Sequence, residues 1–237
     1  MDEITSEIGV VFQNSVLDQS LTVMDNLKIR TSFYGLSKDV REKNIQEIID
    51  LLDLKPILKK QIRNLSGGQK RKVDIARAMV HKPSLLILDE PTTGLDPKTR
   101  KMVWGLVNHI REETGMTVFL TTHYLEEAEK ASFVTIMNKG VIIAEGTPLE
   151  LKNLYAKDYL LAYGNKDNKL EEFASKNNIP FNYSESKGGY KLYYSDICST
   201  KEAIKLFDKY ISDFEILKGT MDDVFLRVTS SEASSLE

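Results

Sequence analysis

The feature that most constrains the fold is a short apolar run that ends in two carboxylates. Residues 85–88 read Leu-Leu-Ile-Leu, and Asp89 and Glu90 follow directly. A half-exposed strand alternates apolar and polar residues, whereas a parallel strand with helices on both faces is apolar throughout. We therefore expect residues 84–88 to form a central parallel strand covered on both faces, with Asp89 and Glu90 at its exit.

Strand and helix patterns alternate on either side of this run. Apolar, β-branched segments predict further strands at residues 8–12, 116–120, 133–137 and 141–145, the last two joined by the turn Asn138-Lys139-Gly140. Amphipathic patterns predict helices between them, and residues 20–65 form a helical insertion that extends to a helical subdomain of about residues 20–80. This alternation favours an α/β fold with a parallel sheet over residues 1–156.

The pattern changes after residue 156. Residues 157–229 predict the order β-α-β-β-α-β, which is typical of a ferredoxin-like α+β domain. The second helix of that unit is expected at residues 200–211, and a last helix begins near Thr220. The final residues, 230–237, are small and polar, and we expect them to form a disordered tail.

Composition excludes several classes of protein. The 237 residues carry a net charge of -3 with no basic cluster, so nothing favours a nucleic-acid partner. The single cysteine, Cys198, permits no intrachain disulfide, and a reducing cytoplasmic setting is expected. The sequence contains no run of about 18 apolar residues, so it predicts no membrane span.

The turn Ser66-Gly67-Gly68-Gln69 precedes a predicted helix and is suited to phosphate. Two glycines let the backbone approach a phosphate closely, and the helix N-terminus favours negative charge. The Gln69 amide adds a hydrogen-bonding group for a phosphate or a ribose. The alternative is an ordinary N-cap, since serine is a common capping residue.

Asp89 and Glu90 lie where open α/β sheets bind their ligands, at the carboxyl end of a strand. Asp89 is expected to hold Mg²⁺, usually through a water, and Glu90 to accept a proton from an attacking water. The alternative is one capping acid and one solvated acid in the turn before Pro91.

Three more residues complete the candidate site. Gln13 ends the first strand and is expected to contact Mg²⁺ or the water, and His123 follows the strand at 116–120 and should reach the same site as Glu90. A capping role is the alternative for His123. Asp96, followed by Pro97, predicts an N-cap that also faces a partner subunit.

Taken together, these residues resemble the ATPase subunits of ABC transporters over residues 8–152. Gln13 resembles the Q-loop glutamine, residues 65–69 the signature motif, and residues 85–90 the Walker B motif with its catalytic glutamate. Residues 94–96 resemble the D-loop, and His123 resembles the switch histidine. The stretches after Asp89 and Thr121, and the motif at 221–226, look like the exporter group of daunorubicin-resistance, sodium-efflux and nodulation-type ATPases.

The resemblance implies a mechanism, a fold and a set of partners. Two P-loop NTPase-like subunits, in a homodimer or heterodimer, close head to tail around two ATP molecules with Mg²⁺. Each ATP lies between the Walker motifs of one subunit and the signature (here Ser66, Gly67, Gly68 and Gln69) of the other. Closure acts on transmembrane permease subunits through the helical insertion, so the protein is expected to be peripheral on the inner face of the membrane.

The sequence departs from that family at its start. It contains no Gly-Lys dipeptide, and therefore no G-x-x-x-x-G-K-[ST] phosphate loop, and only twelve residues precede Gln13. The expected parallel sheet is accordingly incomplete, and we expect the chain to be inactive alone. Removal of an N-terminal part, a truncated gene product and a loop supplied by another polypeptide all stay open.

Two other functions stay open. One is a non-catalytic fragment that donates its signature to an intact partner. The other is a non-transport ABC ATPase of the chromosome or DNA-repair type, which places long heptad-rich coiled coils between its halves. No sustained heptad run occurs in this sequence.

Overall fold

A computed structural model of the chain describes residues 3–193 and 213–233. The chain divides into two compact units, an N-terminal unit (Met1–His123) and a C-terminal unit (Tyr124–Glu237), which we describe separately. The boundary near residue 156 stays a prediction. Within the described residues, no helix is both long and apolar enough to cross a membrane.

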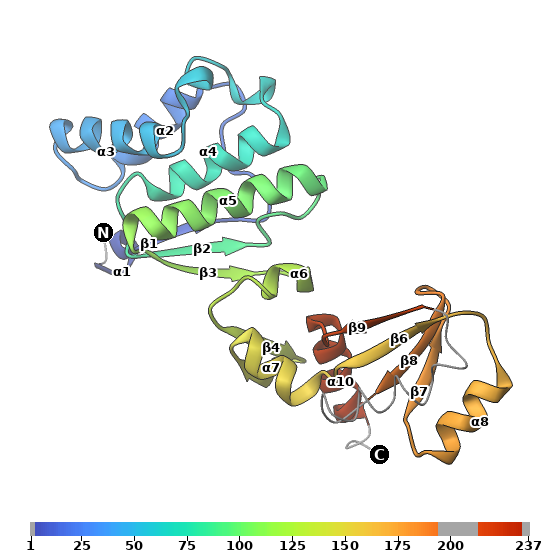
Figure 1. Cartoon of the computed structure of the whole chain (residues 1–237). Coiled ribbons are helices and arrows are strands. Elements are labelled where there is room, and N and C mark those ends of the chain that lie inside the picture. The colour runs from blue at the N-terminus through green and yellow to red at the C-terminus, as the bar shows by residue number, and fades with distance from the viewer. Residues whose placement is uncertain (1–2, 194–212, 234–237) are drawn as a thin grey trace. The chain divides into compact units, whose positions relative to one another are not determined.

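The N-terminal unit contains five α-helices, three strands and two 3₁₀ turns among its described residues (Figure 1). The helices are α1 (Glu3–Glu7), α2 (Val23–Ser32), α3 (Lys38–Leu51), α4 (Gly67–Met79) and α5 (Pro97–Thr114). The strands are β1 (Ile8–Val11), β2 (Leu85–Asp89) and β3 (Thr117–Thr121), and the 3₁₀ turns are Lys55–Ile57 and Ile62–Asn64.

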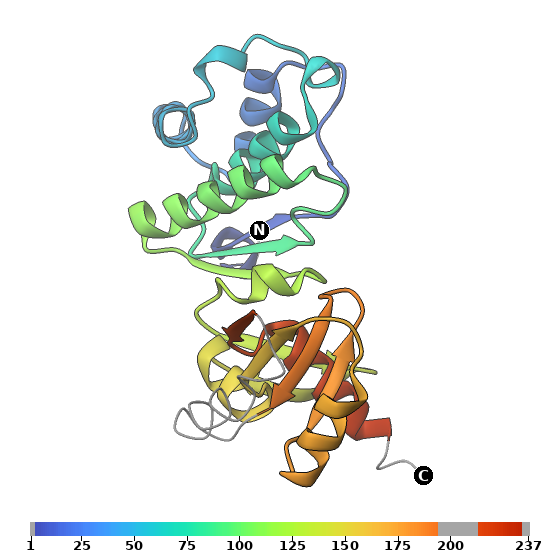
Figure 2. The same cartoon turned by 45° about the vertical axis from the view of Figure 1, so that its right-hand side comes forward.

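The three strands form a parallel sheet in the order β1-β2-β3, so β2 is central, as predicted. Helices α4 and α5 lie along one face of this sheet (Figures 1 and 2). Leu86 and Leu88 are buried in the core with these helices, but their neighbours Leu85 and Ile87 are only half-buried. The prediction of cover on both faces is therefore wrong for these residues, because α4 and α5 pack on one face of the sheet and these side chains lie on the other, where they are only half-buried. Phe119 of β3 is 57% exposed for the same reason.

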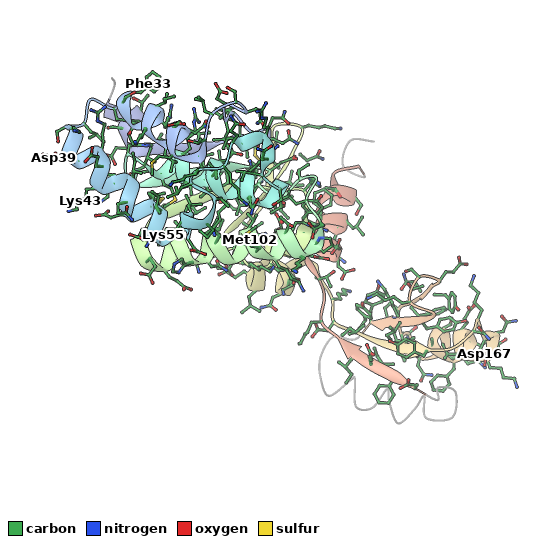
Figure 3. The ribbon with its side chains drawn as sticks, turned by 90° about the horizontal axis from the view of Figure 1, so that it is seen from above. Phe33, Asp39, Lys43, Lys55, Met102 and Asp167 are labelled. Carbon is green, nitrogen blue, oxygen red and sulfur yellow. The ribbon has the colours of Figure 1, made fainter. Side chains whose placement is uncertain are left out.

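The insertion between β1 and α4 is helical, as predicted. Thr22 and Asp25 form a capping box at the start of α2, and Ser37 caps α3. A bridge between Thr22 and Gln61 closes the insertion at its base. Its apolar residues join the core of the N-terminal unit, whereas Phe33, at the end of α2, lies at the surface (Figure 3).

The described part of the C-terminal unit contains a hairpin, a four-stranded sheet and four helices. The helices are α6 (Leu125–Ala128), α7 (Pro148–Tyr155), α8 (Asn168–Lys176) and α10 (Met221–Ala233). The strands are β4 (Val134–Asn138), β5 (Val141–Gly146), β6 (Tyr159–Tyr163), β7 (Phe181–Ser184), β8 (Gly189–Tyr193) and β9 (Phe214–Leu217).

Strand β4 pairs with β5 in an antiparallel hairpin. The predicted turn at residues 138–140 is confirmed, whereas the expected extension of the parallel sheet to residues 133–137 is wrong. Lys139 and Gly140 both have positive φ, +47° and +82°. A two-residue turn with this backbone favours an immediate antiparallel return, so β4 pairs locally.

The second sheet has the antiparallel order β7-β8-β6-β9. The first and third strands of the predicted β-α-β-β-α-β unit are therefore its central pair, as in a ferredoxin-like sheet. Helix α8 packs on one face through Leu170 and Ala174, against Tyr190 among others. The predicted helix at 200–211 lies outside the described residues.

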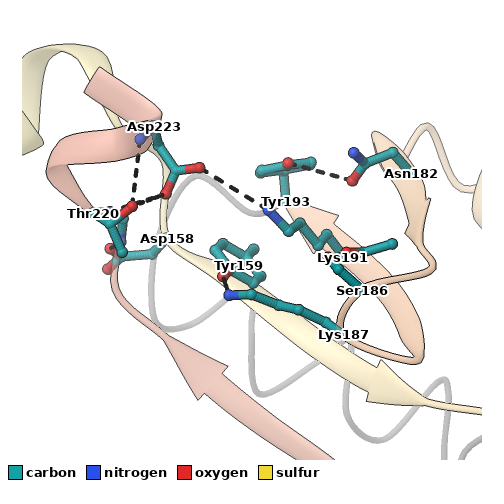
Figure 4. Close-up of polar contacts among 11 residues, drawn as sticks. Asp158, Tyr159, Asn182, Ser186, Lys187, Lys191, Tyr193, Thr220 and Asp223 are labelled. Atoms are coloured by element: carbon teal, nitrogen blue, oxygen red, sulfur yellow. Dashed lines mark hydrogen bonds and ion pairs between the residues drawn. The ribbon is translucent and has the colours of Figure 1, made fainter. Parts of the chain in front are cut away.

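Helix α10 packs on α7 and the β4–β5 hairpin through Met221, Val224 and Val228. Asp223, in its first turn, caps the helix with Thr220 and pairs with Lys191 of β8 at 4.0 Å (Figure 4). The helix continues to Ala233, so the tail predicted from residue 230 begins too early. Residues 234–237 lie outside the described residues.

Candidate functional site

The Glu90 carboxylate is the centre of the candidate site. Its Oε2 accepts hydrogen bonds from Gln13 Nε2 and Thr93 Oγ1, both at 2.9 Å. His123 Nδ1 lies 3.4 Å from its Oε1. Gln13 follows β1, Glu90 follows β2 and His123 follows β3, so three parallel strands deliver these side chains to one edge of the sheet. Gln13, Glu90 and His123 thus meet where the sequence placed them.

Asp89 is tied to the next strand. Its Oδ1 accepts a hydrogen bond of 2.7 Å from Thr121 Oγ1, and the same Oγ1 accepts one of 3.0 Å from the Glu90 backbone N–H. Thr121 is opposite Asp89 in the β2–β3 register. Thr121 was not among the predicted site residues, because its partner is set by strand pairing.

Glu90 has a strained backbone. Its φ is +40°, in the left-handed region that non-glycine residues seldom adopt. Such a conformation costs about 1–3 kcal/mol and persists only where the surroundings enforce it. The turn after β2 is therefore held in place by contacts from elsewhere in the unit.

Arg71 makes the most extensive of these contacts, and the sequence pattern did not reveal it. From α4, its guanidinium donates to the carbonyls of Phe12, Asp89 and Pro91 at 2.6, 3.2 and 2.7 Å. Arg71 is only 6% exposed. Burial lowers the pKa of this guanidinium, and the charges of Asp74 and Asp89 act in the opposite direction.

Asp74, one turn after Arg71 on α4, holds the segment after β1. It is buried, and its Oδ1 accepts a hydrogen bond of 3.0 Å from Ser15 Oγ. Burial raises the pKa of Asp74, while the Ser15 hydrogen bond and the charge of Arg71 partly offset this. Residues on both sides of Gln13 are therefore bonded to α4.

The signature turn is organised locally. Ser66 Oγ accepts from the Gln69 N–H and Gln69 Oε1 accepts from the Ser66 N–H, a capping box at the start of α4. The capping interpretation thus describes the bonds present, and phosphate binding stays a prediction. No hydrogen bond among the described residues joins residues 66–69 to Gln13, Asp89 or Glu90.

The two signature glycines differ in their surroundings. A Cβ on Gly68 would lie 2.7 Å from Thr99 Cγ2 and 2.9 Å from Met102 Cε, so α5 packs directly against this glycine. A Cβ on Gly67 would meet only Leu95 Cδ2, at 3.5 Å. Gly68 is therefore required for helix packing, and Gly67 is the exposed glycine of the turn.

Asp96 caps α5, as predicted. Its Oδ1 accepts hydrogen bonds from the backbone N–H groups of Lys98 and Thr99, each at 3.0 Å. Hydrogen bonds from the Thr99 side chain and backbone lower the pKa of Asp96. Contact with a partner subunit stays a prediction for this residue.

The metal prediction involves few protein ligands. No group of three or more His, Cys, Asp or Glu side chains with the spacing of a metal site occurs in the residues that the structure describes. Asp89 and Gln13 offer oxygen ligands, which Mg²⁺ prefers, and Mg²⁺ commonly takes its other ligands from water and substrate phosphates. The residues present therefore fit Mg²⁺ bound together with a nucleotide.

Known proteins resemble this chain in sequence and in fold. The ABC transporter family model matches residues 1–93. Nod factor export ATP-binding protein I of Rhizobium etli is 31% identical over 229 residues, which cover 95% of this chain and 70% of that protein. Its namesake from Cupriavidus pinatubonensis is 40% identical over 145 residues, 61% of this chain and 44% of that protein.

Solved structures agree with these sequence matches. CbiO1 of Clostridium perfringens, part of the ABC transporter complex cbiONQ, superposes with a TM-score of 0.60 at 29% identity. The superposition covers 65% of this chain and 62% of that one. The matches span 44% and 70% of these two relatives and 62% of the solved chain, so this chain corresponds to part of their length. Its α/β fold with a parallel sheet is that of the P-loop NTPases. The chain belongs to the family of ABC transporter ATP-binding proteins.

Proposed function

We propose that this chain is part of the ATP-hydrolysing subunit of an ABC exporter. The observation that carries the proposal is the Glu90 carboxylate, contacted by Gln13, Thr93 and His123. A carboxylate fixed at the end of a parallel strand is suited to accept a proton from an attacking water. Gln13 and His123 orient Glu90 and that water, and His123 also donates to the terminal phosphate.

Asp89 and Gln13 are the proposed ligands of Mg²⁺, Asp89 through a water. When bound, the ion would neutralise charge on the phosphates. Thr121 fixes the orientation of Asp89 by its hydrogen bond to Oδ1. Phosphoryl transfer depends mainly on positioning and charge neutralisation, so a strand edge that holds carboxylates in fixed orientations suits it.

The second part of the proposal is a partner ATPase subunit. Ser66, Gly67, Gly68 and Gln69 serve the nucleotide held by that subunit, and Asp96 lies at the shared interface. The exposed Ser66 side chain at the N-terminus of a 13-residue helix supports an anion-binding role. The names of the Rhizobium and Cupriavidus relatives, both Nod factor export ATP-binding proteins, support export as the direction of transport.

The third part is a membrane partner. Helix α2 exposes Ile29, and its C-cap Phe33 is 60% exposed, so this end of the helical insertion offers apolar surface. We propose that permease subunits dock on the insertion. The protein would then lie at the inner face of the membrane through its partners.

The 237-residue polypeptide should turn over ATP negligibly when it is alone. It contains no Gly-Lys dipeptide, and the backbone cradle of a phosphate loop supplies most contacts to the triphosphate in P-loop enzymes. Calorimetry should accordingly detect only weak ATP binding. Micromolar affinity, or steady turnover that Glu90→Gln abolishes, would contradict this part of the proposal.

A mixing experiment tests the trans role. The chain is added to an intact ABC ATPase subunit of a relative whose own signature serine is replaced by arginine, and phosphate release is measured. Donation of a signature by this chain should restore turnover. Ser66→Arg should abolish the restoration, because it fills the turn that receives the phosphate.

Glu90→Gln is the matched control. In the mixed pair the competent nucleotide is hydrolysed by the partner's own carboxylate, so this variant should restore turnover as well as the unmodified chain does. Failure of the unmodified chain to restore turnover would favour a binding fragment without a catalytic role. Restoration that depends on Glu90 but not on Ser66 would reverse the proposed assignment.

A further inference from the structure

Arg71 joins two segments that are far apart in the sequence. Its Nη1 donates to the Phe12 carbonyl at the end of β1, and its Nε and Nη2 donate to the Pro91 and Asp89 carbonyls after and within β2. A guanidinium is planar and presents its donors in a fixed fork. One rigid group therefore sets the relative position of both chain segments.

The three carbonyls flank the two residues whose side chains meet at the site. Phe12 precedes Gln13, and Asp89 and Pro91 stand on either side of Glu90. Gln13 Nε2 then donates to Glu90 Oε2 at 2.9 Å. The backbone bonds and the side-chain bond thus form one connected network.

The strain at Glu90 gives Arg71 a specific task. The Asp89 carbonyl belongs to the peptide plane that precedes Glu90. The Pro91 carbonyl lies one peptide beyond the plane that follows Glu90, and the proline ring fixes the φ angle between those two peptides, so the bonds restrict the chain on both sides of Glu90. The Glu90 N–H is also fixed by Thr121 Oγ1 at 3.0 Å. With these three bonds in place the residue is held at φ +40°, and its carboxylate is directed toward Gln13 and His123.

Asp74 extends the same arrangement. It lies three residues after Arg71 and accepts from Ser15 Oγ, so α4 bonds to residues 12 and 15, on both sides of Gln13. Ser66 is the N-cap of the same helix. A movement of the signature turn along the axis of α4 would therefore displace the backbones of Gln13 and Glu90 together.

We propose that Arg71 is a positioning residue that holds Glu90 in its left-handed conformation and links the signature helix to the Gln13–Glu90 pair. Its consequence for catalysis rests on the proposed function. Arg71 acts through the backbone of the two residues, and it does not touch the reacting atoms.

NMR spectroscopy of the full 237-residue chain tests the proposal. The backbone chemical shifts of residue 90 report its φ, and the side-chain amide signals of Gln13 report its bond to Glu90. Arg71→Met should move residue 90 out of the left-handed region and shift the Gln13 amide signals toward those of an exposed glutamine. Arg71→Lys should give an intermediate change, because one ammonium cannot bridge three carbonyls.

Arg77→Lys is the matched control. Arg77 lies on the same helix and is half-buried, but no hydrogen bond among the described residues joins it to Phe12, Asp89 or Pro91. The signals of Glu90 and the Gln13 side chain should stay in place in this variant. Unchanged signals in a folded Arg71→Met or Arg71→Lys chain would overturn the proposal, as would equal shifts in Arg77→Lys.

A double-mutant cycle gives a second measurement if Arg71→Met does not fold. Glycine adopts a left-handed backbone without strain, so Glu90→Gly removes the strain that Arg71 maintains. Arg71→Lys should then lower the denaturation midpoint more in the Glu90→Gly chain than in the unmodified chain. In the unmodified chain, loss of the Arg71 bonds also releases the strain at Glu90, whereas the Glu90→Gly chain has no such strain to release. Equal losses would contradict the coupling. Neither measurement uses ATP turnover, so each is independent of the mixing experiment.

Discussion

The signature turn and the turn after β2 are stabilised in opposite ways. In the signature turn, Ser66 and Gln69 satisfy each other within four residues. In the turn after β2, Glu90 has a strained φ and depends on partners as distant in sequence as Gln13 and Arg71. A local turn keeps its shape when its surroundings move, whereas a turn held from outside responds to them.

This difference gives the two turns different sensitivities. The signature turn can be presented on a helix end with little support, which suits a surface offered to a partner. The turn after β2 requires the core of the N-terminal unit to be intact. Unfolding of this unit can be followed by fluorescence, because Trp104 of α5 is buried there and is the only tryptophan in the chain.

Arg71→Met should give the largest effect and should act on the turn after β2. The change removes three charge-assisted hydrogen bonds, one buried and two part-buried, and leaves their carbonyls without these donors, which costs about 3 kcal/mol. The free energy of unfolding from urea denaturation measures it. A loss below about 0.5 kcal/mol would mean that the turn holds its own shape, as surface substitutions away from key contacts have effects of that size.

Gly68→Ala should have the next largest effect, and Gly67→Ala should leave the stability unchanged or raise it slightly. A methyl group at Gly68 clashes with Thr99 and Met102, and overpacking of this kind costs about 1–3 kcal/mol. At Gly67 the methyl group meets only Leu95, and replacing glycine in a helix recovers up to about 1 kcal/mol of backbone entropy. Urea denaturation of both variants checks this, and equal losses would show that α5 does not pack tightly on the signature.

Ser66→Ala should cost about 1 kcal/mol, because it removes the N-cap hydrogen bond of α4. The effect should stay local. The amide signals of Gln69 and Lys70 should shift in an NMR spectrum, while those of Gln13 and Glu90 should not. Shifts that reach Glu90 would show that the signature turn is coupled to the turn after β2 even without a displacement of α4.

Asp74→Asn should give the smallest effect, visible as a change with pH. Burial raises the pKa of Asp74 above its ordinary value of 3.8, so the folded state holds the proton more tightly than the unfolded state. The stability from this group is fully present below that value and is lost as pH rises through the folded value. Asparagine does not titrate, and its amide oxygen can still accept the Ser15 hydrogen bond.

The stability of the unmodified chain relative to Asp74→Asn should therefore fall as pH rises from below 3.8 through the raised folded value. Other carboxylates titrate in this range, so the two chains must be compared at each pH. A constant difference between them would indicate that Asp74 carries its charge in the folded state without a burial cost.

Local chemistry made much of the fold predictable. The capping residues Ser66 and Asp96 start helices where the sequence placed them, because a cap requires partners only two or three residues away. The apolar run before Asp89 predicted a central parallel strand, because its pattern lies within a few consecutive residues. Because the carboxyl ends of parallel strands share one edge of a sheet, the sequence also predicted that Gln13, Glu90 and His123 lie close together.

Other features depend on long-range packing and were missed. A strand's apolar pattern does not state how many faces are covered, so the half-exposed residues Leu85 and Ile87 were not foreseen. The alternation of strands and helices extended the expected parallel sheet to residues 133–137, whereas β4 pairs with β5 across the turn at Lys139 and Gly140.

The sequence by itself determined the family, the strand-end placement of the candidate site and the local caps, because each depends on short-range patterns of residue type. Only the tertiary structure revealed Arg71, Asp74 and Thr121 as the residues that hold the site. Their partners are backbone carbonyls or side chains brought near by folding, and an Arg, Asp or Thr with such a partner has the same one-letter code as one in solvent. The strained φ of Glu90 is the result of those contacts, and no residue pattern encodes it.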